Sequence, residues 1–437
     1  MPTTRSTTCS ARIALAGVCV LAAVGASGLA SAPGAHAASD RQVGLAALDS
    51  VATSGPAAPG ALVLDDGIGR AFALDTLRDE LIVFDIGPSF LSRVATVRLG
   101  PSPSDVAVDT VGHRVVVADD VADMVSVIDA TATTPAVVAT FPTGSVDAEA
   151  IAVDGASSTV YVANQATDTV TVLHLDTGVA TLVPVGDAPA DVAVDPITHT
   201  VYVAEAGGAS VSTIVGGAPG ARAAIGATPR SLSVVGDRVL VATDELAPTS
   251  SVFRVRAYDR DLHELATSAN LGARASGVAV DAQLRLVFVR TEAGELRALG
   301  LDALDELTLT PPPVTGGQPR QVTVQQSTHR LLLVTTDRRT ATVTLLGVAA
   351  SPAFVPGILP PARIGMPYRA RIEAVASPGP VSYSVKPVEL PSGLVLDSAT
   401  GEIRGTPRAA GTHSLLVTAS NGSATSAMAS FKIVVSP

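Results

Sequence analysis

The chain has 437 residues, of which 47% are hydrophobic and 16% charged, and its formal net charge is −11. This apolar content is enough for more than one buried core. The acidic balance and an aromatic content of 3% without tryptophan exclude a nucleic-acid-binding protein, which needs a cationic surface and stacking side chains.

The first 37 residues have the pattern of an export signal. Arg5 and Arg12 precede an apolar stretch over residues 13–29, and Ala35-His36-Ala37 forms a cleavage site. An uncleaved membrane anchor is the alternative, but the many Ala and Gly residues disfavour it. We therefore expect residues 1–37 to be removed, leaving a bacterial protein without a membrane span that is secreted or held at the cell surface.

Both cysteines, Cys9 and Cys19, lie in this predicted signal peptide. The mature protein is expected to contain no disulfide, thiol nucleophile or cysteine metal site.

Seven copies of a short apolar pattern run through residues 60–349. The clearest copies end at Asp109, Asp154 and Asp195, and the seven anchors follow one another at steps of 41 to 45 residues. Apart from the seventh, each copy contains four β-rich runs separated by Gly, Pro and Asp turns. A period of about 40–45 residues with four strands predicts a seven-bladed β-propeller over residues 38–349.

Large or β-branched residues recur seven positions after the anchors and are predicted to pack between neighbouring blades: Phe72, Val116, Tyr161, Tyr202 and Phe288. The seventh repeat lacks an outer strand. The apolar segment at residues 43–51 belongs to no repeat, so we expect it to supply that strand and close the ring.

The repeats resemble the YVTN-repeat β-propeller family, whose motif is carried here by Tyr161-Val162-Ala163-Asn164 and Tyr202-Val203-Ala204-Glu205. The resemblance implies an exported or surface-layer protein and assigns no activity.

A short linker is predicted at residues 350–361, followed by an Ig-like β-sandwich over residues 362–437. Three of its motifs, Gly365-Met366-Pro367-Tyr368, residues 390–397 and residues 400–407, resemble the putative-Ig (cadherin-like) domains of bacterial surface proteins. The resemblance implies a spacer or adhesive module. No Asp-x-Asp pair is present in this region, which weakens the case for cadherin-type calcium binding.

Three histidines, His113, His199 and His329, each follow an anchor by four residues. Equivalent positions in different blades are spread around the ring and cannot converge on one metal ion. We predict that these histidines and the anchor aspartates shape the turn between the first two strands of each blade.

Polar residues gather where the second strands end and the inner strands begin, at one mouth of the central channel. Acids occupy the early blades and arginines the later ones, and the candidate ligand-binding residues are Asp105, Asp119, Asp120, Glu149, Asn164, Asp191, Glu205, Arg230, Asp244, Arg274 and Arg320. A mouth with opposite charges on its two sides could orient a small polar ligand or a charged loop of a partner. The alternative is that these residues only turn the chain.

The sequence contains no nucleophile elbow, phosphate loop, dinucleotide fingerprint or zinc-protease helix. It therefore predicts an all-β, exported, non-catalytic binding or scaffold protein whose partner is a cell-surface protein, a wall component or a small polar ligand. The alternative is a lactonase-like hydrolase or lyase with a metal held by Glu149, Asp191 and Asp244. No cofactor is assigned, and Ca²⁺ is the one ion left open.

Overall fold

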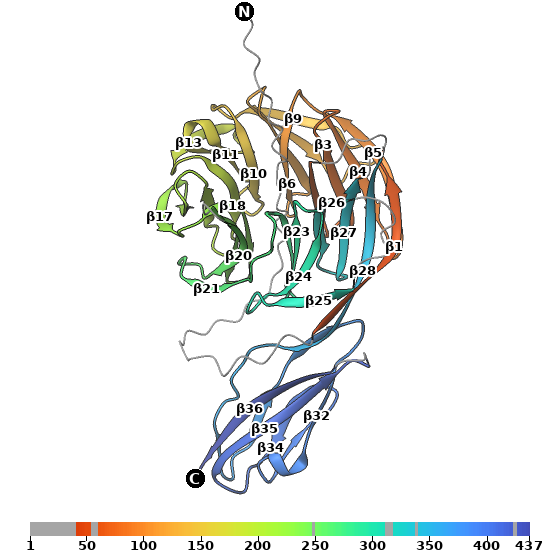
Figure 1. Ribbon diagram of the computed structural model, residues 1–437, viewed down its shortest axis with the longest axis vertical. Helices are drawn as coiled ribbons and strands as arrows, with labels where there is room; N and C mark the ends of the chain where they lie inside the picture. The colour runs from red at the N-terminus through yellow and green to blue at the C-terminus, as the bar shows by residue number, and fades with distance from the viewer. Residues whose placement is uncertain (1–40, 54–59, 247–249, 311–317, 337–339, 423–425) are drawn as a thin grey trace, which may run out of the picture.

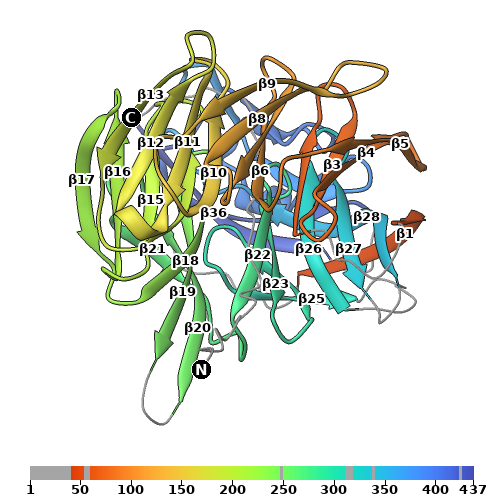
Figure 2. The same ribbon diagram turned by 90° about the horizontal axis from the view of Figure 1, so that it is seen from above.

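The computed structural model describes residues 41–53, 60–246, 250–310, 318–336, 340–422 and 426–437. The predicted signal peptide lies outside these residues. The described chain is all-β, with a ring of four-stranded antiparallel blades and a smaller Ig-like domain on one side of the ring (Figures 1 and 2).

The first five blades are separate sheets in the described part of the chain, and each is formed by four consecutive strands. Blade 1 contains β2 (Ala61–Asp65), β3 (Arg70–Asp75), β4 (Glu80–Ile86) and β5 (Leu91–Arg98). Blade 2 contains β6 (Pro103–Asp109), β7 (Arg114–Asp119), β8 (Met124–Asp129) and β9 (Val137–Pro142). Blade 3 contains β10 (Ala148–Asp154), β11 (Thr159–Asn164), the short 3₁₀ helix η2 (Gln165–Thr167), β12 (Thr169–His174) and β13 (Val179–Pro184).

Blade 4 contains β14 (Pro189–Val194), β15 (Val201–Glu205), β16 (Ser210–Val215) and β17 (Ala218–Ala224). Blade 5 contains β18 (Thr228–Val235), β19 (Arg238–Leu246), β20 (Ser251–Tyr258) and β21 (Glu264–Thr267). Blade 6 contains β22 (Ala275–Asp281), β23 (Leu286–Thr291), β24 (Leu296–Gly300) and β25 (Glu306–Thr310). Blade 7 contains β26 (Gln318–Gln325), β27 (Arg330–Thr336), β28 (Ala341–Phe354) and, as its outer strand, β1 (Gln42–Ala52).

The ring is closed by β1, as expected for the apolar segment at residues 43–51. This strand pairs antiparallel with β28 from Val43 to Ala52, and its first residues also pair in parallel with β25. Val43 is fully buried between Leu309 and Ala350. The two ends of the propeller therefore lie in one sheet, and the outer edges of blades 6 and 7 are covered.

Each junction between neighbouring blades is filled by its own hydrophobic cluster. The prediction for the recurring large residues is confirmed, since Phe72, Val116 and Phe288 are fully buried in three of these clusters. Tyr161 and Tyr202 are 7% and 1% exposed in two others. Burial between blades therefore holds the ring together.

The Ig-like domain consists of two packed sheets. One contains β29 (Ala362–Arg363), β36 (Ala427–Ser436), β35 (Gly411–Ser420) and β32 (Ser382–Val385), and the other contains β30 (Tyr368–Arg371), β34 (Glu402–Gly405) and β33 (Leu394–Leu396). The remaining elements are β31 (Ala374–Ser377) and the 3₁₀ helix η3 (Pro387–Glu389).

The predicted linker differs from the structure in its first part. Residues 350–354 continue β28, and β31 of the Ig-like domain pairs with this extension from Ala350 to Phe354. Ser377 also donates a 2.7 Å hydrogen bond to the carbonyl of Val348. One strand therefore runs from the propeller into the Ig-like domain, where the start of a short linker was expected.

Candidate functional site

The candidate residues lie at one end of the propeller, which we call the rim: the turns between the second and third strands of each blade and the entries to the inner strands. The pairs Pro103 with Asp119, Ala148 with Asn164 and Pro189 with Glu205 place these two sets of positions side by side. Because β28 leaves the rim at Ala341 and runs to the opposite face, the Ig-like domain joins the propeller at the far end from the candidate residues.

The candidates that end the second strands are buried and bonded to the chain itself. Asp119 accepts hydrogen bonds from the backbone N–H groups of Val121 and Ala122, at 3.1 and 2.7 Å. Burial raises the pKa of Asp119, and these two hydrogen bonds oppose the shift. The neighbouring Asp120 is half-buried, and its N–H donates to the carbonyl of Ser102. Asp119 therefore has the turn-forming role that was the alternative to binding.

Asn164 and Glu205 also serve their own blades. The Asn164 amide donates to the hydroxyls of Thr169 and Thr171, at 3.2 and 3.0 Å.

The fully buried Glu205 carboxylate accepts hydrogen bonds from the N–H of Gly186 and the hydroxyl of Ser210, and it pairs with Arg222 at 2.7 Å. Both carboxylate oxygens of Glu205 therefore already accept hydrogen bonds from the same chain.

Two inner-strand acids bridge neighbouring blades. Asp105 accepts a hydrogen bond from the N–H of Ile151, at 3.0 Å, and Asp191 accepts one from the N–H of Leu232, at 2.7 Å. These N–H groups follow β-bulges at the start of the inner strands β10 and β18. The inner strand of each blade has a strand partner on one side only, so a carboxylate from the preceding blade satisfies an N–H donor at its free edge.

The acids on the early blades influence one another. Burial raises the pKa of Asp191 well above its ordinary range, the hydrogen bond from Leu232 opposes this, and the charges of Asp105 and Glu149 raise it further. Glu149, the bulged residue of β10, is half-buried. The early-blade side of the rim is therefore a site of accumulated negative charge.

The later blades carry the arginines. Arg230 and Arg274 direct their Nε atoms to the same oxygen of Asp244, at 2.8 and 2.7 Å. Asp244 is 2% exposed, whereas both arginine side chains are about one-third exposed. Arg320 is exposed, and its Nε donates to the hydroxyl of Thr336 at 2.9 Å. The two arginines on Asp244 link blades 5 and 6 across the rim.

The proposed metal ligands do not form a metal site in the described residues. Glu149, Asp191 and Asp244 belong to blades 3, 4 and 5, and they do not form a cluster with their ligand atoms close together. Asp244 in addition pairs with two guanidinium groups, which would repel a cation from that carboxylate.

One metal-compatible cluster is found in the described chain, on the hairpin between β20 and β21: Asp259, Asp261 and His263. Asp259 accepts the N–H groups of Asp261 and His263 at 3.0 and 2.8 Å. These bonds account for the arrangement as a turn, and the hairpin lies away from the rim.

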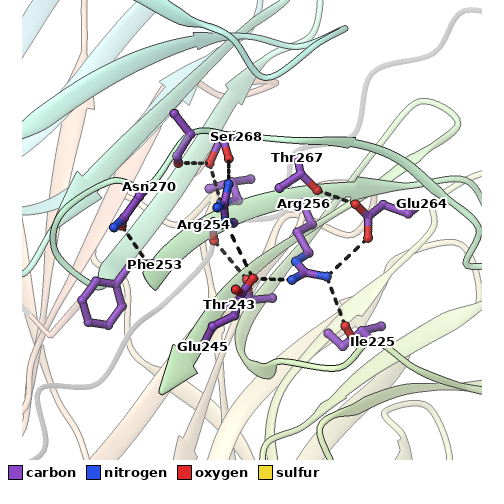
Figure 3. Close-up of polar contacts among 12 residues, drawn as sticks. Ile225, Thr243, Glu245, Phe253, Arg254, Arg256, Glu264, Thr267, Ser268 and Asn270 are labelled. Atoms are coloured by element: carbon purple, nitrogen blue, oxygen red, sulfur yellow. Dashed lines mark hydrogen bonds and ion pairs between the residues drawn. The ribbon is translucent and has the colours of Figure 1, made fainter. Parts of the chain in front are cut away.

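Blade 5 contains a second group of charged side chains that are paired with one another (Figure 3). Arg256 contacts Glu245 and donates to the carbonyl of Ile225, while Glu264 lies 3.3 Å away. Arg254 donates to the carbonyl of Ser268 at 2.6 Å. These arginines are therefore held within blade 5.

On the opposite face, the three histidines have the predicted turn positions, with φ values of 51° to 58°. Sequence reasoning missed their partners. Each ring nitrogen pairs with the buried anchor aspartate of the preceding blade: His113 with Asp65, His199 with Asp154 and His329 with Asp281. The sequence signal is a fixed offset of about one repeat between Asp and His.

A pocket of about 280 Å³ lies between the propeller and the Ig-like domain. Leu284 and His329 line it from the propeller, and Arg371, Tyr383 and Thr400 from the Ig-like domain. No candidate rim residue reaches it.

Comparisons with known proteins support the fold. Residues 351–436 match the family model described as "Putative Ig domain". No curated protein matches the chain in sequence.

The solved structures that resemble the chain include hydrazine synthase of Kuenenia stuttgartiensis, at 15% identity and a TM-score of 0.57, with 67% of this chain and 97% of that chain covered. They also include U3-55K, at 12% identity and a TM-score of 0.56, with 68% of this chain and 98% of that chain covered. The RRP9 WD40 repeats match at 12% identity and a TM-score of 0.54, with 69% of this chain and 98% of that chain covered. At these identities the likeness shows the fold alone. The protein is thus a β-propeller followed by an Ig-like domain.

Proposed function

We propose that this protein is an exported, non-catalytic binding protein that presents the propeller rim to a partner at the cell surface. One observation carries the proposal: the Ig-like domain is attached at the face opposite the rim through β28 and β31. In this arrangement the rim face of the propeller can bind a partner, while the opposite face carries the Ig-like domain. Export and the affiliation with YVTN-type propellers belong to the proposal and rest on the sequence patterns described above.

The rim chemistry suits binding better than catalysis. Its buried acids, among them Asp105, Asp119 and Glu205, are engaged by N–H groups, a hydroxyl and an arginine of the same chain. The exposed positions at the tips of the rim loops include Leu77, 75% exposed, and Val121, 67% exposed. Apolar tips beside a charged ring resemble the mixed surfaces through which proteins recognise one another.

The proposal is tested by capturing partners from cell-envelope fractions with the full-length protein and two matched variants. Leu77→Glu alters a rim loop tip, and Ile197→Glu alters an exposed loop tip, 54% exposed, on the opposite face. We expect Leu77→Glu to lose the partner and Ile197→Glu to retain it. Loss with Ile197→Glu alone would place binding on the other face and overturn the proposal.

The hydrolase or lyase alternative requires a bound metal at the rim, so metal content distinguishes the two functions. Protein purified without chelator should contain less than about a tenth of a metal ion per chain if the proposal is right. A stoichiometric metal that is lost in Glu149→Gln would support the enzyme instead.

A further inference from the structure

Four arginines lie together where blades 5, 6 and 7 meet the rim: Arg230, Arg274, Arg290 and Arg320. Arg230 and Arg320 occupy the β-bulges of the inner strands β18 and β26. A bulge turns a side chain out of the regular alternation of the strand, which here frees two cations from packing between blades.

The two carboxylates nearest to these arginines do not balance them. Asp244 is shared by Arg230 and Arg274, and Glu292 lies 3.6 Å from the Nη1 atom of Arg274. Among the residues that the structure describes, these four cations therefore have two carboxylate partners, in a protein whose overall charge is −11.

Arg290 is the most unusual member of the group. It is 5% exposed and forms no ion pair with any residue that the structure describes. Its guanidinium donates to the backbone carbonyls of Arg320 and Thr291. Burial and the positive charge of Arg320 lower the pKa of Arg290 to about 10, against the opposing charge of Glu292, so the group remains a cation at neutral pH. A buried cation that no carboxylate contacts directly is costly, and such a group marks a place where an anion would be stabilised.

The strand register shows why no acid stands opposite this cation on the paired strand. In blades 2 and 4 the inner strand places Asp105 opposite Ala118 and Asp191 opposite Ala204. In blade 6 the same register pairs Gly277 with Arg290. The acid has been replaced by glycine and the alanine by arginine, so the local charge is inverted.

Arg320 completes the arrangement at the surface. It is exposed, its Nε binds Thr336, and it takes part in no ion pair within the described residues. Arg290 donates to the backbone carbonyl of Arg320, and Arg274 lies beside Glu292; we call these three residues the arginine row.

We propose that Arg274, Arg290 and Arg320 form a binding site for an oxyanion group, a phosphate or a carboxylate of a ligand. Guanidinium groups present planar pairs of N–H donors that match both anions. The inference gives the proposed rim-binding function a ligand class, and it rests on that function.

The test is calorimetric titration of the full-length protein with inorganic pyrophosphate and with citrate at low ionic strength. The variant Arg320→Gln removes one exposed guanidinium of the row. Arg297→Gln is the control, because Arg297 lies on β24 of the neighbouring blade 6 and is already paired with two carboxylates, those of Glu295 and Glu306.

We expect at least one of the two anions to bind the wild type, and Arg320→Gln to weaken that binding about tenfold, the effect of losing one charge-assisted hydrogen bond. Arg297→Gln should change it by less than about twofold, because the charge of Arg297 is already neutralised by its two carboxylate partners. Arg320→Lys, which keeps the charge and loses the planar fork, should fall between the wild type and Arg320→Gln. A melting curve for each variant verifies that it is folded.

Absence of binding to both anions at millimolar concentration, or equal weakening by Arg297→Gln and Arg320→Gln, would overturn the inference. Rim-dependent capture of a partner would still stand in that case, so the two proposals fail separately. A third titration uses a long polyphosphate. A higher affinity per phosphate group than that of pyrophosphate would indicate a polymeric ligand, and an equal affinity per phosphate group would indicate a small one.

Discussion

The carboxylate of Asp191 in blade 4 accepts a 2.7 Å hydrogen bond from the backbone N–H of Leu232 in blade 5. An equivalent hydrogen bond runs from the N–H of Ile151 in blade 3 to the carboxylate of Asp105 in blade 2. Residues that were candidates for ligand binding therefore fasten neighbouring blades. The ionised form of Asp191 is destabilised in this position, because the carboxylate is buried and lies near the charges of Asp105 and Glu149.

The raised pKa of Asp191 predicts a pH dependence of stability. A carboxyl whose pKa is higher in the folded than in the unfolded state binds more protons when folded, so the free energy of unfolding decreases as pH rises. The decrease begins near the ordinary aspartate pKa of about 3.9 and ends above the folded pKa, with a slope of at most about 1.4 kcal/mol per pH unit for one proton.

Asp191→Asn should remove much of this slope in urea unfolding measured across that pH window. Asp176→Asn, at a side chain that is 73% exposed, is the control and should leave the slope unchanged. An unaltered slope in Asp191→Asn would contradict the assignment.

His329 should give a pH dependence of stability with the same sign as Asp191, although it is a base and Asp191 is an acid. The hydrogen bond to Asp281 raises the pKa of His329, against the effect of burial. The contribution of this pair to stability is complete below the unfolded histidine pKa of about 6.5 and is lost as pH rises through the higher folded value.

His329→Gln should therefore lower the free energy of unfolding at pH values below the pKa of His329 in the folded protein. Above that pKa the substitution should have less effect. Chemical denaturation over this range measures the difference. His263→Gln is the control, since its side chain is 76% exposed. A constant difference between wild type and His329→Gln at every pH would show that the pair is not titrating.

Replacement of Phe288 by alanine tests the packing between blades 6 and 7. The ring is fully buried in the cluster at that junction, so Phe288→Ala should lower the free energy of unfolding by about 3–5 kcal/mol. Phe90→Ala, at a ring that is 50% exposed, should cost about 1 kcal/mol or less. Equal losses in urea unfolding would mean that the junction is not a tightly packed core.

Closure of the ring by β1 is tested with a charge at its most buried position. Val43→Asp would place a carboxylate between Leu309 and Ala350, at a cost of about 3 kcal/mol or more. Hydrogen exchange should accelerate in β25 and β28, while β12 in blade 3 should stay protected. Leu48→Asp, on the same strand at 39% exposure, is the control. Unchanged exchange in β25 and β28 would show that β1 does not close the propeller.

The elements that the sequence predicts well are those that repeat locally. The anchor at Asp109 and the column containing Phe72 and Val116 depend on strand alternation, which is visible within a few residues. The closing strand could be predicted from an apolar segment left over from the repeats and a seventh repeat that lacked its outer strand.

The features that escaped prediction depend on contacts between distant residues. The bond from Leu232 to Asp191 joins two residues 41 positions apart at the free edge of β18, and no local sequence pattern predicts it. The pairing of His329 with Asp281 spans one repeat. The extension of β28 past Ala350 depends on β31 as its partner, so the Pro-rich composition of that segment suggested a linker instead.

The central claim, that the rim is the binding face, is tested most directly by photo-cross-linking in intact cells. A photoreactive amino acid replaces Val121 at a rim loop or Val111 at a loop on the opposite face of the same blade; both side chains are 67% exposed. The account predicts a discrete cross-linked species from position 121 and none from position 111. The same species from position 111, with none from position 121, would contradict it.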